Sequence, residues 1–166
     1  ISDEEYKKNG AILCNSAKEV FEKAEIILKA SCPKSSEINL IKDSSILIGL
    51  LDPFLDKEII NQLIKKKINI FSLNLLPRIT RAQSMDVLSS QANLAGYRAV
   101  IESVEEFEKA IPMMMTAAGT VTPAKILVIG AGVAGLQAIA TAKRLGGIVS
   151  ATDVRAAVKE QVESLG

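Results

Sequence analysis

The chain has 166 residues, of which 48% are hydrophobic, and a net charge of +1. This length suffices for one domain with a sizeable core or for parts of two domains. The near balance of interspersed charges argues against a nucleic-acid-binding surface, and no apolar run is long enough to span a membrane, so we expect a soluble protein. The sequence contains no histidine, which removes the commonest general base, the Ser–His triads and most zinc sites. We expect no metal site.

The first half of the chain alternates helical patterns with short apolar runs. Helices are expected after Ser2, after Ser16, at Ser35–Ile41 and at Asp56–Lys67, and strands at Ala11–Cys14, Ile26–Lys29, Ile46–Leu51 and Ile68–Leu73. This alternation is typical of parallel βαβ units. Residues 1–86 are therefore interpreted as an N-terminal α/β domain, part of a flavodoxin-like parallel sheet. The two cysteines, Cys14 and Cys32, lack CxxC spacing and are expected to be buried free thiols in a reducing compartment.

A loop segment, Arg78–Asp86, lies between the last of these strands and the next helical pattern. Parallel sheets bind ligands at the C-terminal edge of their strands, which is where this loop is expected to lie. Side chains in and just after the loop would supply a fork of donors, an amide, an acceptor and a hydroxyl: Arg78, Gln83, Asp86 and Ser89. The alternative, which the spacing does not exclude, is that Arg78 and Asp86 only pair with each other and brace the loop.

Residues 87–112 are interpreted as a long connecting helix that runs to about Lys109 and is ended by Ile111-Pro112. Small residues recur in it at helical spacing and permit close packing against another element: Ala92, Ala95, Gly96 and Ala99. The methionine triplet that follows, Met113–Met115, is interpreted as core filler rather than as a cofactor contact.

Residues 113–166 carry the most informative pattern. The short apolar run Ile126–Ile129 is typical of a parallel strand that is buried on both faces. It leads into the sequence GAGVAG at residues 130–135 and then into a helical pattern that two further glycines end. A second strand, Ile148–Thr152, follows and ends at Asp153. The glycine motif thus opens a helix inside a β-α-β unit, the arrangement of a Rossmann dinucleotide-binding domain.

Each glycine of the motif has a physical role in such a unit. Gly130 permits the tight turn from strand to helix, Gly132 lets a pyrophosphate approach the backbone, and Gly135 lets helix and strand pack closely. The phosphates would then lie on unpaired N–H groups at the positive end of the helix dipole. The alternative is a glycine-rich turn in an ordinary α/β protein, which the register of both strands, the helix and the terminal acid disfavours.

Asp153 bears on the choice of cofactor. At the end of the second strand it can accept hydrogen bonds from a ribose diol and repels a 2′-phosphate, which favours NAD over NADP. Arg155, two residues further on, weakens this preference. Because only two strands of a dinucleotide sheet are present and half of such a sheet needs three, the chain is interpreted as an excerpt of a longer protein, cut at both ends.

Two long stretches resemble one protein family. Residues 77–100, PRITRAQSMDVLSSQANLAGYRAV, and residues 113–166, which begin MMMTAAGTVTPAKILVIGAGVAG, are similar to the NAD(H)-binding domain of proton-translocating nicotinamide nucleotide transhydrogenases. The resemblance covers the chain from about Glu25 to its end and is weaker before that residue. The family also includes the alanine dehydrogenases, which share the same two-domain plan.

The resemblance implies an α/β fold of two parallel-sheet domains joined by a long helix, with NAD(H) held between them and only the start of the Rossmann domain present. It implies cofactor contacts at the nicotinamide end from Arg78, Gln83, Asp86 and Ser89, at the pyrophosphate from Gly130, Gly132, Val133, Ala134 and Gly135, and at the adenosine from Asp153, Val154 and Arg155. Three of these residues are candidates for a catalytic role. We expect Gln83 to place the ring, and Arg78 and Asp86 to organise the loop and the carboxamide.

The resemblance also implies partners. These are a domain that binds NADP(H), the second substrate, and a membrane-spanning component that couples hydride transfer to proton translocation. A homodimer is expected as well. The chain would lie peripherally on the cytoplasmic face of the bacterial inner membrane, or on the matrix side in mitochondria.

Two other functions stay open at this point: an alanine dehydrogenase-like amino-acid oxidoreductase and a non-catalytic NAD-binding module. The resemblance to alanine dehydrogenases implies a catalytic Lys and a catalytic His, where this chain has Ser31 and Leu51. An amino-acid dehydrogenase must bind a substrate carboxylate and move a proton. Direct hydride transfer between two nicotinamides needs no protein base, which fits the absence of histidine.

Overall fold

The computed structural model describes residues 1–52, 54, 57–77 and 79–166. The chain divides into two compact units, Ile1–Met85 and Asp86–Gly166, which are described separately. The boundary places the expected connecting helix inside the second unit. Within the described ranges, no helix combines the length and the apolar character that crossing a membrane requires.

The first unit is built on a three-stranded parallel sheet in the order β1-β2-β3. Strands β1 (Ile26–Lys29), β2 (Ile46–Gly49) and β3 (Asn69–Ser72) pair so that Leu47 lies between Ile27 and Ile70. The helices are α1 (Asp3–Lys8), α2 (Ala17–Lys23), α3 (Ser35–Ile38) and α4 (Lys57–Lys65), and two 3₁₀ helices follow the sheet, η1 (Leu73–Leu75) and η2 (Thr80–Met85). The predicted alternation of helices and parallel strands is confirmed.

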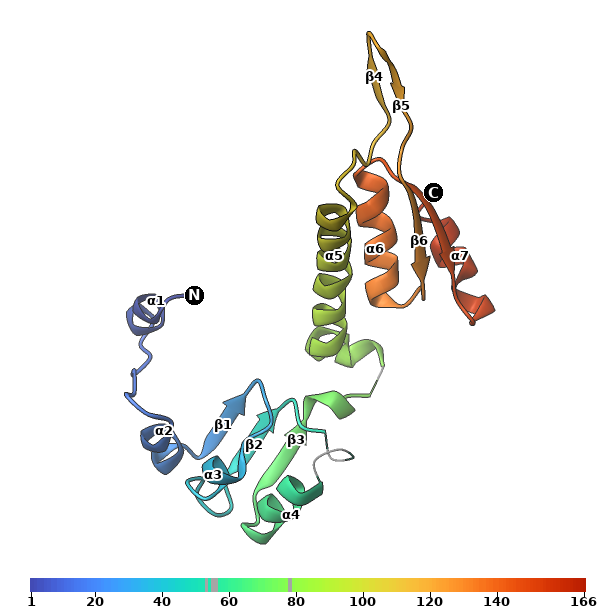
Figure 1. The fold of residues 1–166 in the computed structure, drawn as a ribbon. Helices are drawn as coiled ribbons and strands as arrows, with labels where there is room; N and C mark the ends of the chain where they lie inside the picture. The colour runs from blue at the N-terminus through green and yellow to red at the C-terminus, as the bar shows by residue number, and fades with distance from the viewer. Residues whose placement is uncertain (53, 55–56, 78) are drawn as a thin grey trace. The chain divides into compact units, whose positions relative to one another are not determined.

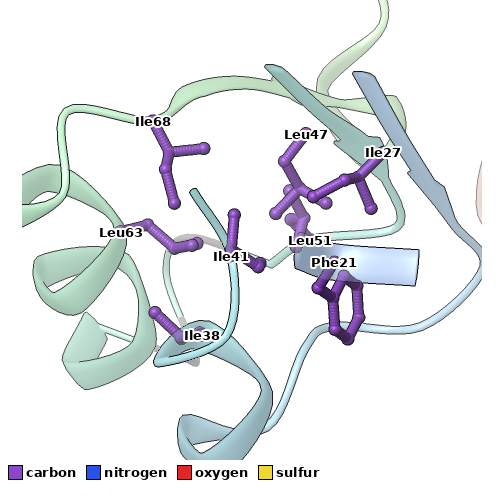
Figure 2. Close-up of a cluster of buried hydrophobic side chains, with 8 residues drawn as sticks. All are labelled: Phe21, Ile27, Ile38, Ile41, Leu47, Leu51, Leu63 and Ile68. Atoms are coloured by element: carbon purple, nitrogen blue, oxygen red, sulfur yellow. The ribbon is translucent and has the colours of Figure 1, made fainter. Parts of the chain in front are cut away.

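One hydrophobic cluster joins the helices of this unit to the sheet (Figure 2). Its side chains come from α2, α3, α4, strands β1 and β2 and the adjoining loops: Phe21, Ile27, Ile38, Ile41, Leu47, Leu51, Leu63 and Ile68. Leu47 and Leu63 are fully buried, and burying such a side chain stabilises the fold by about 1.5–3 kcal/mol. The apolar faces of the short helices are therefore what hold the sheet.

Some predictions for this unit are wrong. Residues 11–14 are described and form no strand. In strand β1 only Ile27 reaches the core, and its neighbour Leu28 is 76% exposed. Cys14 and Cys32, which were expected to be buried, are only half-buried. The predicted start of the fourth helix at Asp56 lies outside the described residues.

The second unit contains two packed helices, a parallel strand pair, a hairpin and a short C-terminal helical segment (Figure 1). Its elements are α5 (Val87–Phe107), β4 (Met114–Thr116), β5 (Gly119–Val121), β6 (Lys125–Ile129), α6 (Val133–Arg144), β7 (Ile148–Thr152), the 3₁₀ helix η3 (Ala156–Val158) and α7 (Lys159–Glu163). Strands β6 and β7 pair in parallel, with α6 as the connection between them. The predicted β-α-β unit is confirmed.

The backbones of helices α5 and α6 approach closely at Gly96. A Cβ added to Gly96 would overlap the backbone carbonyl of Ala134, which is in α6. Nearby, the side-chain amide of Asn93 donates to that of Gln137 at 3.3 Å. Gly96 therefore marks a helix–helix contact, as expected, whereas Ala95 and Ala99 of the same small-residue pattern are exposed.

The prediction that β6 is buried on both faces is wrong. Ile126 and Val128 pack against Val100, Ala138 and Ala142 of the two helices. The alternate side chains of the same strand, Leu127 and Ile129, are 63% and 81% exposed. The reason is that within this unit α5 and α6 cover one face of the strand pair.

The methionine triplet lies at an antiparallel hairpin, β4–β5, that the sequence pattern did not predict. Met113, Met114 and Met115 are 59%, 47% and 80% exposed, so their interpretation as core filler is wrong. Gly119, with φ +137°, follows the two-residue turn and allows the chain to reverse there. The hairpin projects beyond α5, α6 and β6 (Figure 1).

Gly96→Ala should destabilise the second unit by about 1–3 kcal/mol, the usual cost of overfilling a packed contact. The added Cβ would meet backbone, which cannot move away without separating α5 from α6. At an exposed helix position the same change would stabilise by about 1 kcal/mol, so the sign itself is diagnostic. The measurement is a circular-dichroism melt of the full-length protein.

Gln91→Ala, at an exposed position of the same helix, is the control and should leave the melting temperature nearly unchanged. A Gly96→Ala variant that melts at or above the control would show that the two helices do not touch at this point.

Candidate dinucleotide-binding site

The glycine motif forms the turn between β6 and α6. Gly130 has φ +93°, in the left-handed region that favours glycine. Its N–H donates to the carbonyl of Thr152 at 2.7 Å, which ties the turn to the end of β7. Gly135 lies against the carbonyl of Gly130, and an added Cβ would overlap it. The predicted roles of Gly130 in the turn and of Gly135 in close packing are confirmed.

Gly132 is the N-cap of α6 and borders open space. Among the described residues, a Cβ added there would meet within 4 Å only the Nη2 atom of Arg155, at 3.9 Å. The residue has φ −78° and ψ −167°, which side-chain-bearing residues also adopt. The lack of a side chain at Gly132 is therefore not needed by the fold. It leaves room for a group to approach the N–H groups of the first turn, formed by Val133, Ala134 and Gly135, at the positive end of the helix dipole.

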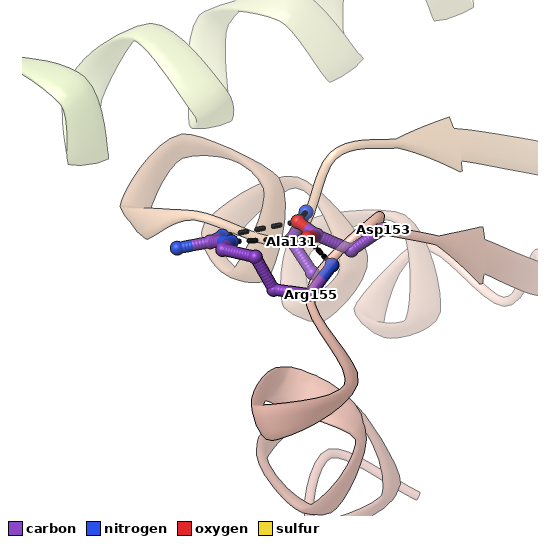
Figure 3. A network of polar contacts seen from close by, with 3 residues as sticks. All are labelled: Ala131, Asp153 and Arg155. Carbon is purple, nitrogen blue, oxygen red and sulfur yellow. Dashed lines mark hydrogen bonds and ion pairs between the residues drawn. The ribbon is translucent and has the colours of Figure 1, made fainter.

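Asp153 lies beside this turn, and its carboxylate is saturated with hydrogen bonds (Figure 3). Oδ2 accepts from the backbone N–H of Ala131 at 2.7 Å and from Nη2 of Arg155 at 3.0 Å. Oδ1 accepts from the backbone N–H of Arg155 at 2.8 Å and from its Nε at 3.0 Å. The carboxylate thus holds the glycine turn and the guanidinium at the end of β7.

These contacts fix the charge of the acid. The bidentate guanidinium of Arg155, followed by the two backbone N–H groups, holds the pKa of Asp153 well below its ordinary value. The same contact raises the pKa of Arg155. Asp153 is therefore a carboxylate at neutral pH, as accepting a ribose diol and repelling a 2′-phosphate both require. The neighbouring Val154 is fully exposed to solvent.

The residues in and just after the loop have different structural positions. Asp86 caps α5: its Oδ1 accepts from the N–H of Ser89 at 3.0 Å, and its Oδ2 accepts from the Ser89 hydroxyl at 2.7 Å. Gln83 is exposed on η2, a turn anchored by the buried Ala82. Arg78 lies outside the described residues, so the alternative that it only pairs with Asp86 and braces the loop stays open.

The structure thus brings together the glycine turn, Asp153 and Arg155 in the second unit, and Asp86 with Ser89 at the start of α5. Gln83 belongs to the first unit, so the expectation that NAD(H) is held between the two domains stays a prediction. Sequence reasoning missed Ala131, whose N–H binds Asp153. The available signal was its position in the sequence, because Ala131 lies between Gly130 and Gly132 in the turn. Among the described residues, no cluster of three or more potential ligands could hold a metal ion.

A parallel strand pair joined by a helix, with a glycine turn after the first strand and a carboxylate at the end of the second, is the arrangement at the start of a Rossmann-type α/β fold. Two family models match almost the whole chain, "Alanine dehydrogenase/PNT, N-terminal domain" over residues 1–95 and "Alanine dehydrogenase/PNT, C-terminal domain" over residues 99–166. The chain belongs to the alanine dehydrogenase/PNT family.

Individual relatives agree with this assignment. The chain is 53% identical over its full length to an NAD(P) transhydrogenase subunit alpha protein of Rhodospirillum rubrum, of which it covers 44%. It superposes on a crystal structure of transhydrogenase from Sinorhizobium meliloti with a TM-score of 0.94 and 56% identity, covering 100% of this chain and 49% of that one. An alanine dehydrogenase from Methanococcus maripaludis is more distant, with 30% identity over 93% of this chain and 42% of its own length. The chain thus spans about half the length of the relatives it matches.

Gly132→Val should abolish binding of a dinucleotide such as NADH while leaving the fold intact. The valine side chain would fill the open space beside the helix N-terminus, where a Cβ comes within 4 Å of no described backbone atom outside Gly132 and its two chain neighbours. Fluorescence titration with NADH and a thermal melt of the full-length protein measure the two effects.

Gly135→Val is the matched control, because its side chain would overlap the carbonyl of Gly130 and should lower the melting temperature. If Gly132→Val bound NADH normally, the glycine turn would not be a phosphate site. A strongly lowered melting temperature for Gly132→Val would show that this glycine serves the fold.

Proposed function

We propose that the chain forms the NAD(H)-binding part of a proton-translocating transhydrogenase, in which hydride passes directly from NADH to NADP⁺. The observation that carries this proposal is the carboxylate of Asp153 beside a glycine turn in which no described backbone atom fills the space next to Gly132, in a chain most similar, among the relatives above, to transhydrogenase subunits. The nicotinamide ring supplies the hydride chemistry, so the protein's task is to bind and orient.

Each segment of the chain has its own task in this proposal. The N–H groups at the start of α6 hold the pyrophosphate, and Asp153 accepts from the ribose on the adenosine side, where Val154 and Arg155 also lie. Gln83 aligns the nicotinamide, and Arg78 contributes to its loop. Asp86 and Ser89 support that loop by capping α5. The two reacting carbons must come within about 3–3.5 Å, which makes alignment the main contribution to the rate.

An amino-acid dehydrogenase is the competing proposal, and two residues argue against it. Leu51, where the resemblance implies a catalytic histidine, is 1% exposed and belongs to the hydrophobic cluster. Ser31, where it implies a lysine, carries no charge at neutral pH. Since the sequence has no histidine at all, the usual proton carrier for oxidation of an amino acid is absent. Incubating the full-length protein with alanine and NAD⁺ should yield no NADH.

The proposed reaction requires partners. NADP(H) would be held by a separate domain, and a membrane-spanning component would couple hydride transfer to proton movement. We propose that the NAD(H)-binding part is a homodimer, peripheral on the cytoplasmic face of a bacterial inner membrane or on the matrix side in mitochondria. A non-catalytic NAD-binding module would bind NADH but would not exchange hydride when an NADP-binding partner is added.

Asp153→Ala should weaken NADH binding about tenfold or more, the scale of losing hydrogen bonds to a charged group. The unmodified full-length protein should prefer NADH to NADPH, because the carboxylate repels a 2′-phosphate. Titration of both variants with both nucleotides is the measurement. Equal affinity of the unmodified protein for NADH and NADPH would contradict the assignment of the site to NAD(H).

Gln83→Asn should slow single-turnover hydride transfer with the NADP-binding partner by about a hundredfold, because a displacement of about 1 Å at a reacting group has an effect of that size. The substitution keeps the amide and shortens its reach by one methylene. NADH affinity should change less than about tenfold, since the phosphate and adenosine contacts supply binding that is uniform between ground and transition states.

Gln91→Ala, an exposed amide outside the loop, is the matched control and should leave both quantities unchanged. An unaltered rate for Gln83→Asn would leave Gln83 as a loop residue only and would remove the catalytic part of the proposal.

A further inference from the structure

The hydrogen bonds of Asp153 leave it no spare acceptor position. An ionised carboxylate has about four lone-pair positions, two on each oxygen. In this structure all four are used: Ala131 N–H and Arg155 Nη2 bind Oδ2, and the Arg155 backbone N–H and Nε bind Oδ1. A ribose diol that is to donate to Asp153 must therefore displace a donor that is already bound.

Two of the four donors are fixed by the course of the chain. Ala131 is 1% exposed in the turn after β6, and its N–H cannot move without opening the turn. The backbone N–H of Arg155 follows the carboxylate by two residues in a tight local bond. The other two donors belong to the guanidinium of Arg155, whose side chain is 57% exposed on a flexible stem, whereas the Asp153 side chain beneath it is 8% exposed.

The guanidinium has the geometry of a substitute for the diol. Its Nε and Nη2 atoms occupy one acceptor position on each carboxylate oxygen, and a ribose presents two neighbouring hydroxyls. Its Nη2 atom also lies within 4 Å of the space beside Gly132, where a pyrophosphate would approach. The side chain therefore covers both the ribose acceptor and the edge of the glycine turn (Figure 3).

We propose that Arg155 competes with the adenosine ribose for Asp153, so that nucleotide binding exchanges the two side-chain hydrogen bonds of Arg155 for those of the ribose hydroxyls. This proposal rests on the proposed NAD(H) site and adds a specificity-determining role for Arg155. The exchange preserves the number of hydrogen bonds on Asp153 and selects a ligand that offers two adjacent donors. A ligand without the diol does not need the exchange.

The opposite role is that Arg155 positions Asp153 and helps it to hold the ribose. The two roles differ in the sign of one measurable coupling. If Arg155 competes, the benefit of the diol is larger after the guanidinium is removed. If Arg155 positions the acid, that benefit is smaller after removal. Any general attraction between the positive charge and the phosphates affects ligands with and without the diol alike, and cancels in the ratio.

The experiment compares NADH with an NADH analogue whose adenosine ribose lacks both the 2′ and the 3′ hydroxyl, by titration of the full-length protein. The dissociation constant of the analogue is divided by that of NADH, so that a larger ratio means a larger benefit of the diol. This ratio is measured for the unmodified protein, for Arg155→Ala and for Arg144→Ala. Arg144 is an exposed arginine in the last turn of α6 and controls for the loss of one positive charge from the same unit. Arg155→Lys keeps the positive charge but removes the guanidinium. This second variant tests whether the paired Nε and Nη2 donors are required.

We expect the ratio to rise about twofold to fivefold in Arg155→Ala, the scale on which a largely exposed ion pair acts, to rise less in Arg155→Lys and to stay unchanged in Arg144→Ala. A ratio that is unchanged or lower in Arg155→Ala would overturn the competition while leaving the NAD(H) site in place. Absence of NADH binding to the unmodified protein would instead remove the proposed function and this inference with it.

Discussion

The close approach of α6 to the carbonyl of Gly130 is the contact on which the arrangement of the second unit depends. It is possible because Gly135 has no side chain, and an added Cβ there would overlap that carbonyl. The helix can therefore begin directly beyond the end of β6, with its first N–H groups beside the open space at Gly132. A second close contact, Gly96 against the backbone of Ala134, holds the long helix α5 on the same helix. The two glycines, Gly96 and Gly135, thus set the positions of α5, α6 and β6.

Asp153 stabilises the glycine turn and also carries a negative charge at the candidate site. Its carboxylate accepts from the N–H of Ala131 and thereby holds the glycine turn against the end of β7. The same group is kept ionised by Arg155. A side chain that serves both the fold and the candidate cofactor site has to share a limited number of acceptor positions between them. This sharing makes the neighbouring arginine relevant to nucleotide selection, although it is mostly exposed.

The loop before α5 shows a similar overlap between structure and proposed function. Asp86 and Ser89 bind each other in a helix cap, which is a sufficient structural reason for both residue types. Any contact that they make with a nucleotide would be in addition to this local role. Gln83, by contrast, is exposed on a short 3₁₀ helix and takes no part in this helix cap. The cap therefore gives no structural reason for an amide at this position, and the proposed role of Gln83 is to align the nicotinamide ring.

The sequence by itself determined most of the local structure of this protein, apart from the wrongly predicted strand at residues 11–14 and the unpredicted β4–β5 hairpin. Helical and strand periodicity predicted the parallel βαβ order, and the spacing of the glycines at residues 130–135 predicted the turn and its packing, because these features depend on neighbours along the chain. It did not predict that Met113–Met115 would be exposed at a hairpin or that Ile129 would be uncovered, since burial depends on which other elements cover a face. Only the tertiary structure decided that Arg155 occupies the carboxylate of Asp153, because a hydrogen-bond partner is chosen by side-chain geometry in space and not by spacing in sequence.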